Sequence, residues 1–206
     1  MKILGYGEDA LTLWTIQHRL AEILDKVGDR SLASECQIFF RPSFGRRGGV
    51  KSSQFGEFDF IILARDNLYL GESKWDRSPE IAGSNSLTVR EEQVLRHWVL
   101  RFYIREWAFG QYTSWNQFIR EATKKLYQEQ IQKPLAPTGS LLASNLMTIL
   151  GVIRHHFPAE PPVIDLLLYL HDGTKPVPIA VTPDNFCLIP VDYSGSLEGN
   201  FICMEM

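Results

Sequence analysis

The chain has 206 residues, of which 45% are hydrophobic and 22% are charged. This is the usage of an ordinary globular domain, so the composition excludes intrinsic disorder, collagen and a coiled coil. The formal net charge of −3 argues against a protein that coats nucleic acid by bulk charge, although it leaves room for a local basic patch. The three cysteines include no Cys-x-x-Cys pair, and therefore indicate neither a disulfide framework nor a zinc site.

The length favours a single domain with a full core, spanning residues 1–206. No apolar run reaches the about 18 residues that a membrane helix needs. The N-terminus also lacks the long apolar stretch of a signal peptide. We therefore expect a cytoplasmic protein without a membrane partner.

The first part of the chain is predicted to form one helix followed by three strands. Apolar residues recur at helical spacing over Glu8–Val27. Residues of high strand propensity, bounded by turn residues, predict strands at Cys36–Arg41, Glu57–Ala64 and Leu68–Trp75. The last two strands are close enough in sequence to form a hairpin.

Helices dominate the middle of the chain, and strands return at its end. Helical periodicity covers Leu87–Phe109 and Trp115–Ile131, and the apolar segment Leu141–Phe157 is predicted to be a buried helix. The last predicted strands are Val163–His171, Val177–Thr182 and Cys187–Tyr193. This order of elements is that of a mixed α/β domain.

The predicted hairpin carries three charged residues that suggest chemistry. Its turn is predicted to centre on Asp66 and Asn67. In that register Asp59 pairs with Lys74, and Glu72 lies on the same face. Both faces are otherwise apolar, so the hairpin is predicted to be buried, where carboxylates are costly unless a group such as a divalent metal ion neutralises them. A one-residue slip of the register would separate the three charges.

This pattern resembles that of the PD-(D/E)XK nuclease superfamily, also called restriction-endonuclease-like. The shared features are an Asp followed 13 residues later by Glu-x-Lys, on successive antiparallel strands, after a helix with an acidic residue at its start. The resemblance covers about Gly5 to Phe109, with Phe58 in place of the proline of the family name. It implies an α/β fold with a restriction-endonuclease-like mixed sheet flanked by helices, and it leaves residues 110–206 as a helical insertion and C-terminal strands.

The resemblance also implies the residues of a metal site. Asp59 and Glu72 would hold Mg²⁺, for which Mn²⁺ would substitute, together with the backbone carbonyl of Ser73. Lys74 would orient or help to deprotonate the attacking water. The acidic residue of the first helix corresponds to Glu8, which would be a further catalytic residue and metal ligand. The implied activity is Mg²⁺-dependent phosphodiester hydrolysis by a (deoxyribo)nuclease.

A nuclease must also hold a polyanion, and two segments carry suitable side chains. The stretch 40–56 contains basic residues, glycines and no acid, so its backbone can approach phosphates. On the following helix, spacing predicts that His97 shares a polar face with basic residues and that Trp98 lies on the opposite face. The basic stretch is equally explained as a solvated turn, and the helix face is better explained as an ordinary solvent-facing surface. The candidate nucleic-acid-binding residues are Arg41, Arg46, Arg47, Lys51, Arg90, Gln93 and Arg101.

Three alternatives stay open at this point. A catalytically silent module of the same fold would bind nucleic acid or protein. A metal-dependent RNase would use the same residues, because discrimination between DNA and RNA depends on contacts to the 2′-hydroxyl that no motif reveals. Glu72 and Lys74 are also explained as charges that protect an edge strand, with Asp59 as a residue at a strand start. DNA is the expected partner and RNA the alternative, while the oligomeric state is open, with a homodimer as one option.

Overall fold

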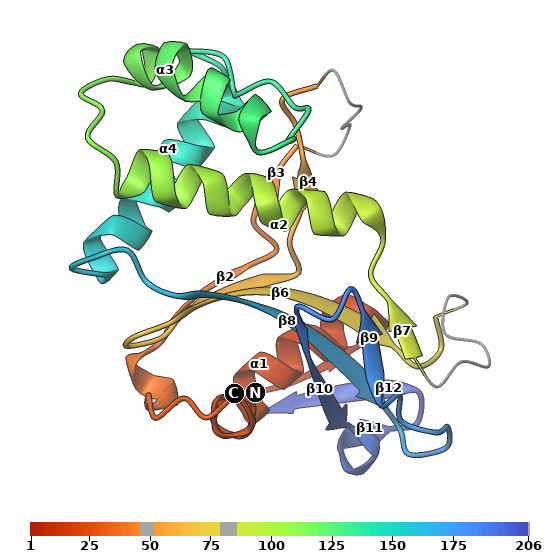
Figure 1. The fold of residues 1–206 in the computed structure, drawn as a ribbon. Coiled ribbons are helices and arrows are strands. Elements are labelled where there is room, and N and C mark those ends of the chain that lie inside the picture. The colour runs from red at the N-terminus through yellow and green to blue at the C-terminus, as the bar shows by residue number, and fades with distance from the viewer. Residues whose placement is uncertain (46–51, 79–85, 206) are drawn as a thin grey trace. The chain divides into compact units, whose positions relative to one another are not determined.

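The computed structural model describes residues 1–45, 52–78 and 86–205, and they form two compact units (Figure 1). Unit 1 comprises Met1–Phe40, Asp59–Val89 and Ile164–Met206, and unit 2 comprises Arg41–Phe58 and Arg90–Val163. The chain enters unit 2 at Arg41, returns to unit 1 at Asp59, and passes through unit 2 again from Arg90 to Val163.

The main sheet of unit 1 has five strands in the order β10-β8-β6-β5-β2. The strands β2 (Gln37–Phe40), β5 (Phe60–Leu63) and β6 (Leu68–Trp75) form an antiparallel meander. The strands β8 (Val163–His171) and β10 (Phe186–Asp192) pair in parallel. The sheet is therefore mixed, and the predicted α/β class is confirmed.

One face of this sheet is covered by α1 (Glu8–Lys26), as Figure 1 shows. The predicted helix over Glu8–Val27 is thus confirmed to within one residue. The acids of its first turn and Lys26 in its last turn complement the helix dipole. The core between helix and sheet includes Leu11, Trp14, Leu20, Ile23, Leu24, Phe60, Ile62, Tyr69, Leu166, Leu168 and Leu170.

Short strands complete unit 1, and of these only β9 (Ala180–Thr182) lies in a segment that the sequence predicted as a strand. The strand β12 (Phe201–Glu205) pairs antiparallel with both β1 (Lys2–Gly5) and β11 (Leu197–Glu198). The strands β7 (Ser86–Thr88) and β9 form a small parallel pair. Strands of two to five residues are too short for an alternating pattern to identify them.

The described residues of unit 2 form a short antiparallel pair of strands and three α-helices. Its elements are β3 (Ser43–Phe44), β4 (Gly56–Glu57), α2 (Glu91–Tyr103), a π-helical turn (Ile104–Ala108), α3 (Trp115–Gln128) and α4 (Leu141–His156). Aromatic rings fill its core, where Tyr103 and Trp115 stack with centroids 5.8 Å apart. Buried polar groups between them are satisfied, because the Trp115 indole N–H donates to the Ala136 carbonyl at 2.8 Å and the Ala136 N–H donates to the Tyr103 hydroxyl at 2.8 Å.

Several predicted boundaries require correction. The helix predicted over Leu87–Phe109 begins at Glu91, because the preceding residues form β7, and it passes into the π-helical turn after Tyr103. The strand predicted from Glu57 begins only at Phe60. The strand predicted from Val177 begins at Ala180, since Pro176 and Pro178 have no N–H to donate to a ladder. No helix within the three described stretches is both long enough and apolar enough to cross a membrane.

Candidate active site on a β-hairpin

The turn between β5 and β6 lies one residue earlier than predicted. The N–H of Ala64 donates to the carbonyl of Asn67 at 3.0 Å, so the turn centres on Arg65 and Asp66. Moving the centre by one residue shifts every cross-strand pair by two. The predicted pairing is therefore wrong, but an even shift keeps each side chain on its predicted face, because side chains alternate along a strand.

In the observed ladder Phe60 pairs with Gly71, next to the predicted site residues. Counting one residue further along each strand places Asp59 opposite Glu72. A direct bond supports this placement, since Oδ2 of Asp59 accepts a hydrogen bond from the backbone N–H of Ser73 at 2.7 Å. Asp59 is thereby held against β6 at the position of Glu72.

The absence of a side chain at Gly71 permits this close approach of the two strands. A Cβ atom at Gly71 would lie 2.0 Å from the ring of Phe60, which is far inside van der Waals contact. The ring of Phe60 therefore lies over the glycine, an arrangement by which an aromatic residue stabilises a glycine on the neighbouring strand. This pair fixes the register immediately before Glu72.

Glu72 and Lys74 share one face of β6 and are both removed from water. Their exposed fractions are 1% and 5%, while Asp59 is half-buried. Ser73 lies between them and points to the opposite face. Acidic and basic side chains are almost never fully buried unless they are paired, because desolvation costs several kcal/mol for each ion. Asp59, opposite Glu72, lies on the same face, and Asp59, Glu72 and Lys74 are called the hairpin cluster below.

The donor atoms of the hairpin cluster suit a hard cation such as Mg²⁺. Asp59 and Glu72 supply two carboxylates, and one of their oxygens already accepts from Ser73. Among the residues that the structure describes, no group of three His, Cys, Asp or Glu side chains is placed to hold a metal ion. A cation would therefore depend on two carboxylates, a backbone carbonyl such as that of Ser73, and water. Mg²⁺ accepts this kind of site, because it commonly keeps several waters and uses one or two carboxylates.

Glu8, the first residue of α1, is bonded to the end of β6. Its Oε2 accepts from the backbone N–H of Trp75 at 2.8 Å and from the hydroxyl of Ser78 at 3.3 Å. The helix α1 packs on the sheet face opposite to Glu72 and Lys74. Glu8 thus links the start of α1 to the strand that carries the motif, and its Oε1 makes neither of these bonds.

The predicted basic loop is only partly within the described residues. Arg46, Arg47 and Lys51 lie outside them. Arg41, in unit 2, donates from Nε to Oε1 of Glu57 at 2.7 Å and forms an ion pair with it. The carboxylate of Glu57 therefore compensates the positive charge of Arg41.

The predicted faces of α2 are right for Val99 and Phe102, which are buried, but wrong for Gln93, His97 and Trp98. Gln93 and His97 are buried in unit 2, with exposed fractions of 6% and 0%, and the ring centroid of His97 lies 4.9 Å from that of Phe58. Trp98, predicted to lie on the opposite, apolar face, is 50% exposed. Periodicity finds the two faces of a helix, but it cannot tell which face is covered when each carries both apolar and polar residues.

The other predicted residues of this helix have local roles. Arg90 precedes α2 and is exposed, and its backbone N–H donates to the Gln93 side-chain oxygen at 3.2 Å. Arg101 donates from Nη1 to the carbonyl of Val163 at 2.6 Å. These bonds stabilise the helix start and the end of unit 2.

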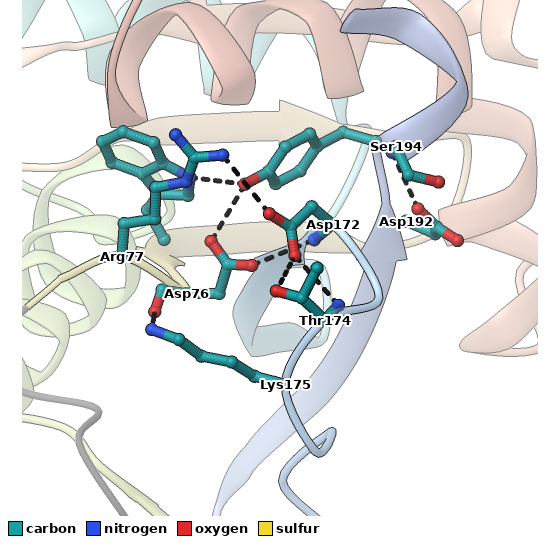
Figure 2. A network of polar contacts seen from close by, with 9 residues as sticks. Asp76, Arg77, Asp172, Thr174, Lys175, Asp192 and Ser194 are labelled. Carbon is teal, nitrogen blue, oxygen red and sulfur yellow. Dashed lines mark hydrogen bonds and ion pairs between the residues drawn. The ribbon is translucent and has the colours of Figure 1, made fainter. Parts of the chain in front are cut away.

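A second polar cluster lies where three strands of unit 1 end, and the sequence analysis missed it (Figure 2). Asp76, Asp172 and Tyr193, called the strand-end network below, directly follow β6, β8 and β10. Oδ1 of Asp76 accepts from the Tyr193 hydroxyl at 2.9 Å, and Oδ2 accepts from the Asp172 N–H at 3.0 Å. Asp76 is 1% exposed. The only sequence signal was the position of all three at strand ends.

The remaining donors around this network belong to its neighbours. The Asp172 carboxylate accepts from the N–H of Thr174 at 3.0 Å and pairs with Arg77 at 3.3 Å. Hydrogen bonds from Thr174, against a smaller opposing effect of burial, lower the pKa of Asp172 to about 2. The Tyr193 hydroxyl accepts from the Trp75 indole N–H at 2.7 Å. The bonds run between residues of unit 1, which indicates a structural role.

In comparisons with protein-family profiles, curated proteins and solved structures, no match to this chain was found.

Proposed function

We propose that the chain is a metal-dependent nuclease that hydrolyses phosphodiester bonds in DNA and has a restriction-endonuclease-like fold. The observation that carries the proposal is the hydrogen bond from the Ser73 N–H to Asp59, which holds Asp59 against the strand that bears Glu72 and Lys74. The sheet adds support, because β8 and β10 extend the meander of β2, β5 and β6 in chain order.

Each member of the hairpin cluster has a role in this proposal. Asp59 and Glu72 would hold Mg²⁺, which lowers the pKa of a coordinated water and offsets the charge that develops on the phosphoryl group. Lys74 would donate a hydrogen bond to the attacking water or to a phosphate oxygen. Its burial excludes most competing water, which strengthens such a bond.

A metal titration on labelled single- and double-stranded DNA tests the proposal. We expect cleavage with Mg²⁺ or Mn²⁺ and none in EDTA, since two carboxylates without a cation cannot activate water. Matched RNA substrates decide between a DNase and an RNase. Cleavage that persists in EDTA would exclude the metal-dependent mechanism.

One observation favours a second candidate, a catalytically silent module that binds nucleic acid or protein. No third His, Cys, Asp or Glu side chain joins Asp59 and Glu72 within the described residues in a group placed to hold a metal ion. Mn²⁺ binding, followed by electron paramagnetic resonance, separates the two candidates. A nuclease should bind Mn²⁺ and lose it on Asp59→Asn, whereas a silent module should bind none and cleave nothing.

Glu8→Gln tests whether Glu8 belongs to the site. The amide oxygen can still accept from Trp75 and Ser78, so the fold should lose no more than about 1 kcal/mol, the usual size of one helix-dipole contribution. If Oε1 contacts the metal or its water, the cleavage rate should fall, and the fall should increase as Mg²⁺ becomes scarce. Thermal melts and rates across a Mg²⁺ series measure both. Normal kinetics at limiting Mg²⁺ would show that Glu8 has only a structural role, through its bonds to Trp75 and Ser78.

A further inference from the structure

Unit 2 exposes an aromatic ring that its core does not use. Trp98 on α2 is 50% exposed and is the most exposed of the five tryptophans. Its helical neighbour His97 is fully buried. A large apolar ring left in water is informative when it borders a hollow with polar groups, because this is the composition of a binding site.

Trp98 borders such a hollow, which has a volume of about 280 Å³ and is called the Trp98 pocket here. It is lined by Trp98, Arg101, Phe102, Arg105, Glu129 and Ile131. Phe102 and Ile131 are 1% and 3% exposed, so their side chains are part of the unit 2 core and provide a firm apolar base. Trp98 is the exposed aromatic surface of the pocket.

Two arginines line the same pocket as this indole, and both are held by contacts within unit 2. Arg101 is bonded to the Val163 carbonyl at 2.6 Å. Arg105 lies with its guanidinium carbon 5.5 Å from the centre of the Phe102 ring and bonds to Glu106 and Glu129. Two arginines and one carboxylate, that of Glu129, are thus among the residues that line the pocket. Arg105 belongs to the π-helical turn after α2, and such turns recur at functional sites.

We infer that the Trp98 pocket binds an unstacked base of single-stranded nucleic acid. An indole offers a face on which any base can stack, and arginines beside it contribute cation–π attraction and contacts to the phosphates. Bases inside a duplex are already stacked and cannot enter a pocket of this kind. The inference rests on the proposed function and adds a substrate class to it, namely strands with single-stranded character.

Binding assays in EDTA test the inference without cleavage. The probe is a fluorescently labelled single-stranded DNA 12-mer, and its anisotropy is measured at low salt with the full chain. Trp98→Ala should weaken binding on the order of 10-fold, the usual cost of removing one stacking platform. Trp98→Phe should keep most of the affinity, because a phenyl ring still stacks. Thermal melts confirm that each variant is folded.

The control is Tyr127→Ala, which removes another exposed aromatic ring of unit 2. Tyr127 is 56% exposed and does not line the pocket. It should leave the affinity unchanged. Equal losses for both variants, an unchanged affinity of Trp98→Ala, or no binding of the 12-mer at all would overturn the inference. If Trp98→Ala affected only a protein partner, the pocket would be a protein-docking site and the inference would be wrong.

The two proposals fail in distinguishable ways. If the chain binds single strands through Trp98 but cleaves nothing with Mg²⁺ or Mn²⁺, the proposed nuclease activity is wrong and the proposed base-binding pocket stands. If the chain cleaves, yet Trp98→Ala binds the 12-mer as well as the parent does, only the proposed base-binding pocket is wrong. A duplex of the same sequence should bind in a manner that does not depend on Trp98.

Discussion

The hairpin cluster and the strand-end network both place buried acids on or beside β6, but their partners differ. Asp76, in the network, accepts from a tyrosine hydroxyl and a backbone N–H that the fold supplies for it. In the hairpin cluster Asp59 also accepts from a backbone N–H, that of Ser73, but it lies opposite a second carboxylate, that of Glu72, and Lys74 shares the face of Glu72. Burial of charge therefore does not by itself identify an active site. In our proposal, a second carboxylate on the same face distinguishes the hairpin cluster from the structural acid Asp76.

The largest expected effect is on activity and follows from Glu72→Gln. Loss of one carboxylate should reduce cleavage by more than about 100-fold, beyond the usual cost of changing a residue that merely supports a metal ligand. The amide keeps the shape of the side chain, so stability should change little. Asp59→Asn and Lys74→Ala should also abolish cleavage, but only the carboxylate variants should lose Mn²⁺ affinity.

Urea unfolding of Glu72→Gln shows whether the hairpin cluster is structural instead. If Glu72 served only to neutralise Lys74, its loss would leave a buried ammonium group and cost about 3–5 kcal/mol. A loss of that size in the free energy of unfolding, with full activity in the folded fraction, would show that the hairpin cluster is structural, like the strand-end network. It would contradict the proposed active site.

Asp76→Asn should have the opposite effect to Glu72→Gln. One of the two oxygens that accept from Tyr193 and Asp172 becomes an NH₂ group, which faces a donor and cannot accept. We expect a loss of about 2–3 kcal/mol in the free energy of unfolding and unchanged cleavage per folded molecule. Denaturant unfolding and an activity assay on the same sample measure both. Reduced cleavage with an unchanged free energy of unfolding would show that Asp76 belongs to the active site.

The strand-end network should also make stability depend on pH. The pKa of Asp172 is lowered to about 2 in the folded state, from an ordinary value of 3.8. A lowered pKa contributes stability above the unfolded value, and this contribution is lost as the pH falls from about 4 to about 2. The loss should be at most about 2 kcal/mol.

Asp172→Asn is the control for this pH dependence, because an amide does not titrate in this range. The difference in unfolding free energy between the parent and the variant should shrink as the pH is lowered from about 5 to about 2. A constant difference across that range would show that the pKa of Asp172 is not lowered by folding.

The smallest effects distinguish two buried tyrosines of unit 1. The Tyr193 hydroxyl bonds to Asp76 and Trp75, so Tyr193→Phe should cost about 1–2 kcal/mol. Tyr169 is 0% exposed, and its hydroxyl has no hydrogen-bond partner within the described stretches of the chain. Tyr169→Phe should therefore cost nothing or stabilise by up to about 1 kcal/mol. Equal losses in urea unfolding would mean that Tyr169 has a partner such as a bound water.

The sequence by itself determined the elements with a strong local period and the face on which each hairpin side chain lies. The strands Leu68–Trp75 and Val163–His171 and the helix starting at Glu8 are where their patterns predicted them. Asp59, Glu72 and Lys74 kept their shared face although the pairing was wrong by two residues, because alternation along a strand depends only on odd and even positions.

Only the tertiary structure decided the features that depend on distant partners. The position of the turn rests on a bond between Ala64 and Asn67, which no pattern along the strands reveals. The strand-end network joins residues up to 117 positions apart, so its members look like ordinary turn residues in the sequence. The exposed face of α2, with Trp98 outward and His97 inward, was likewise decided by packing, because periodicity defines the faces of a helix but not which one the core covers.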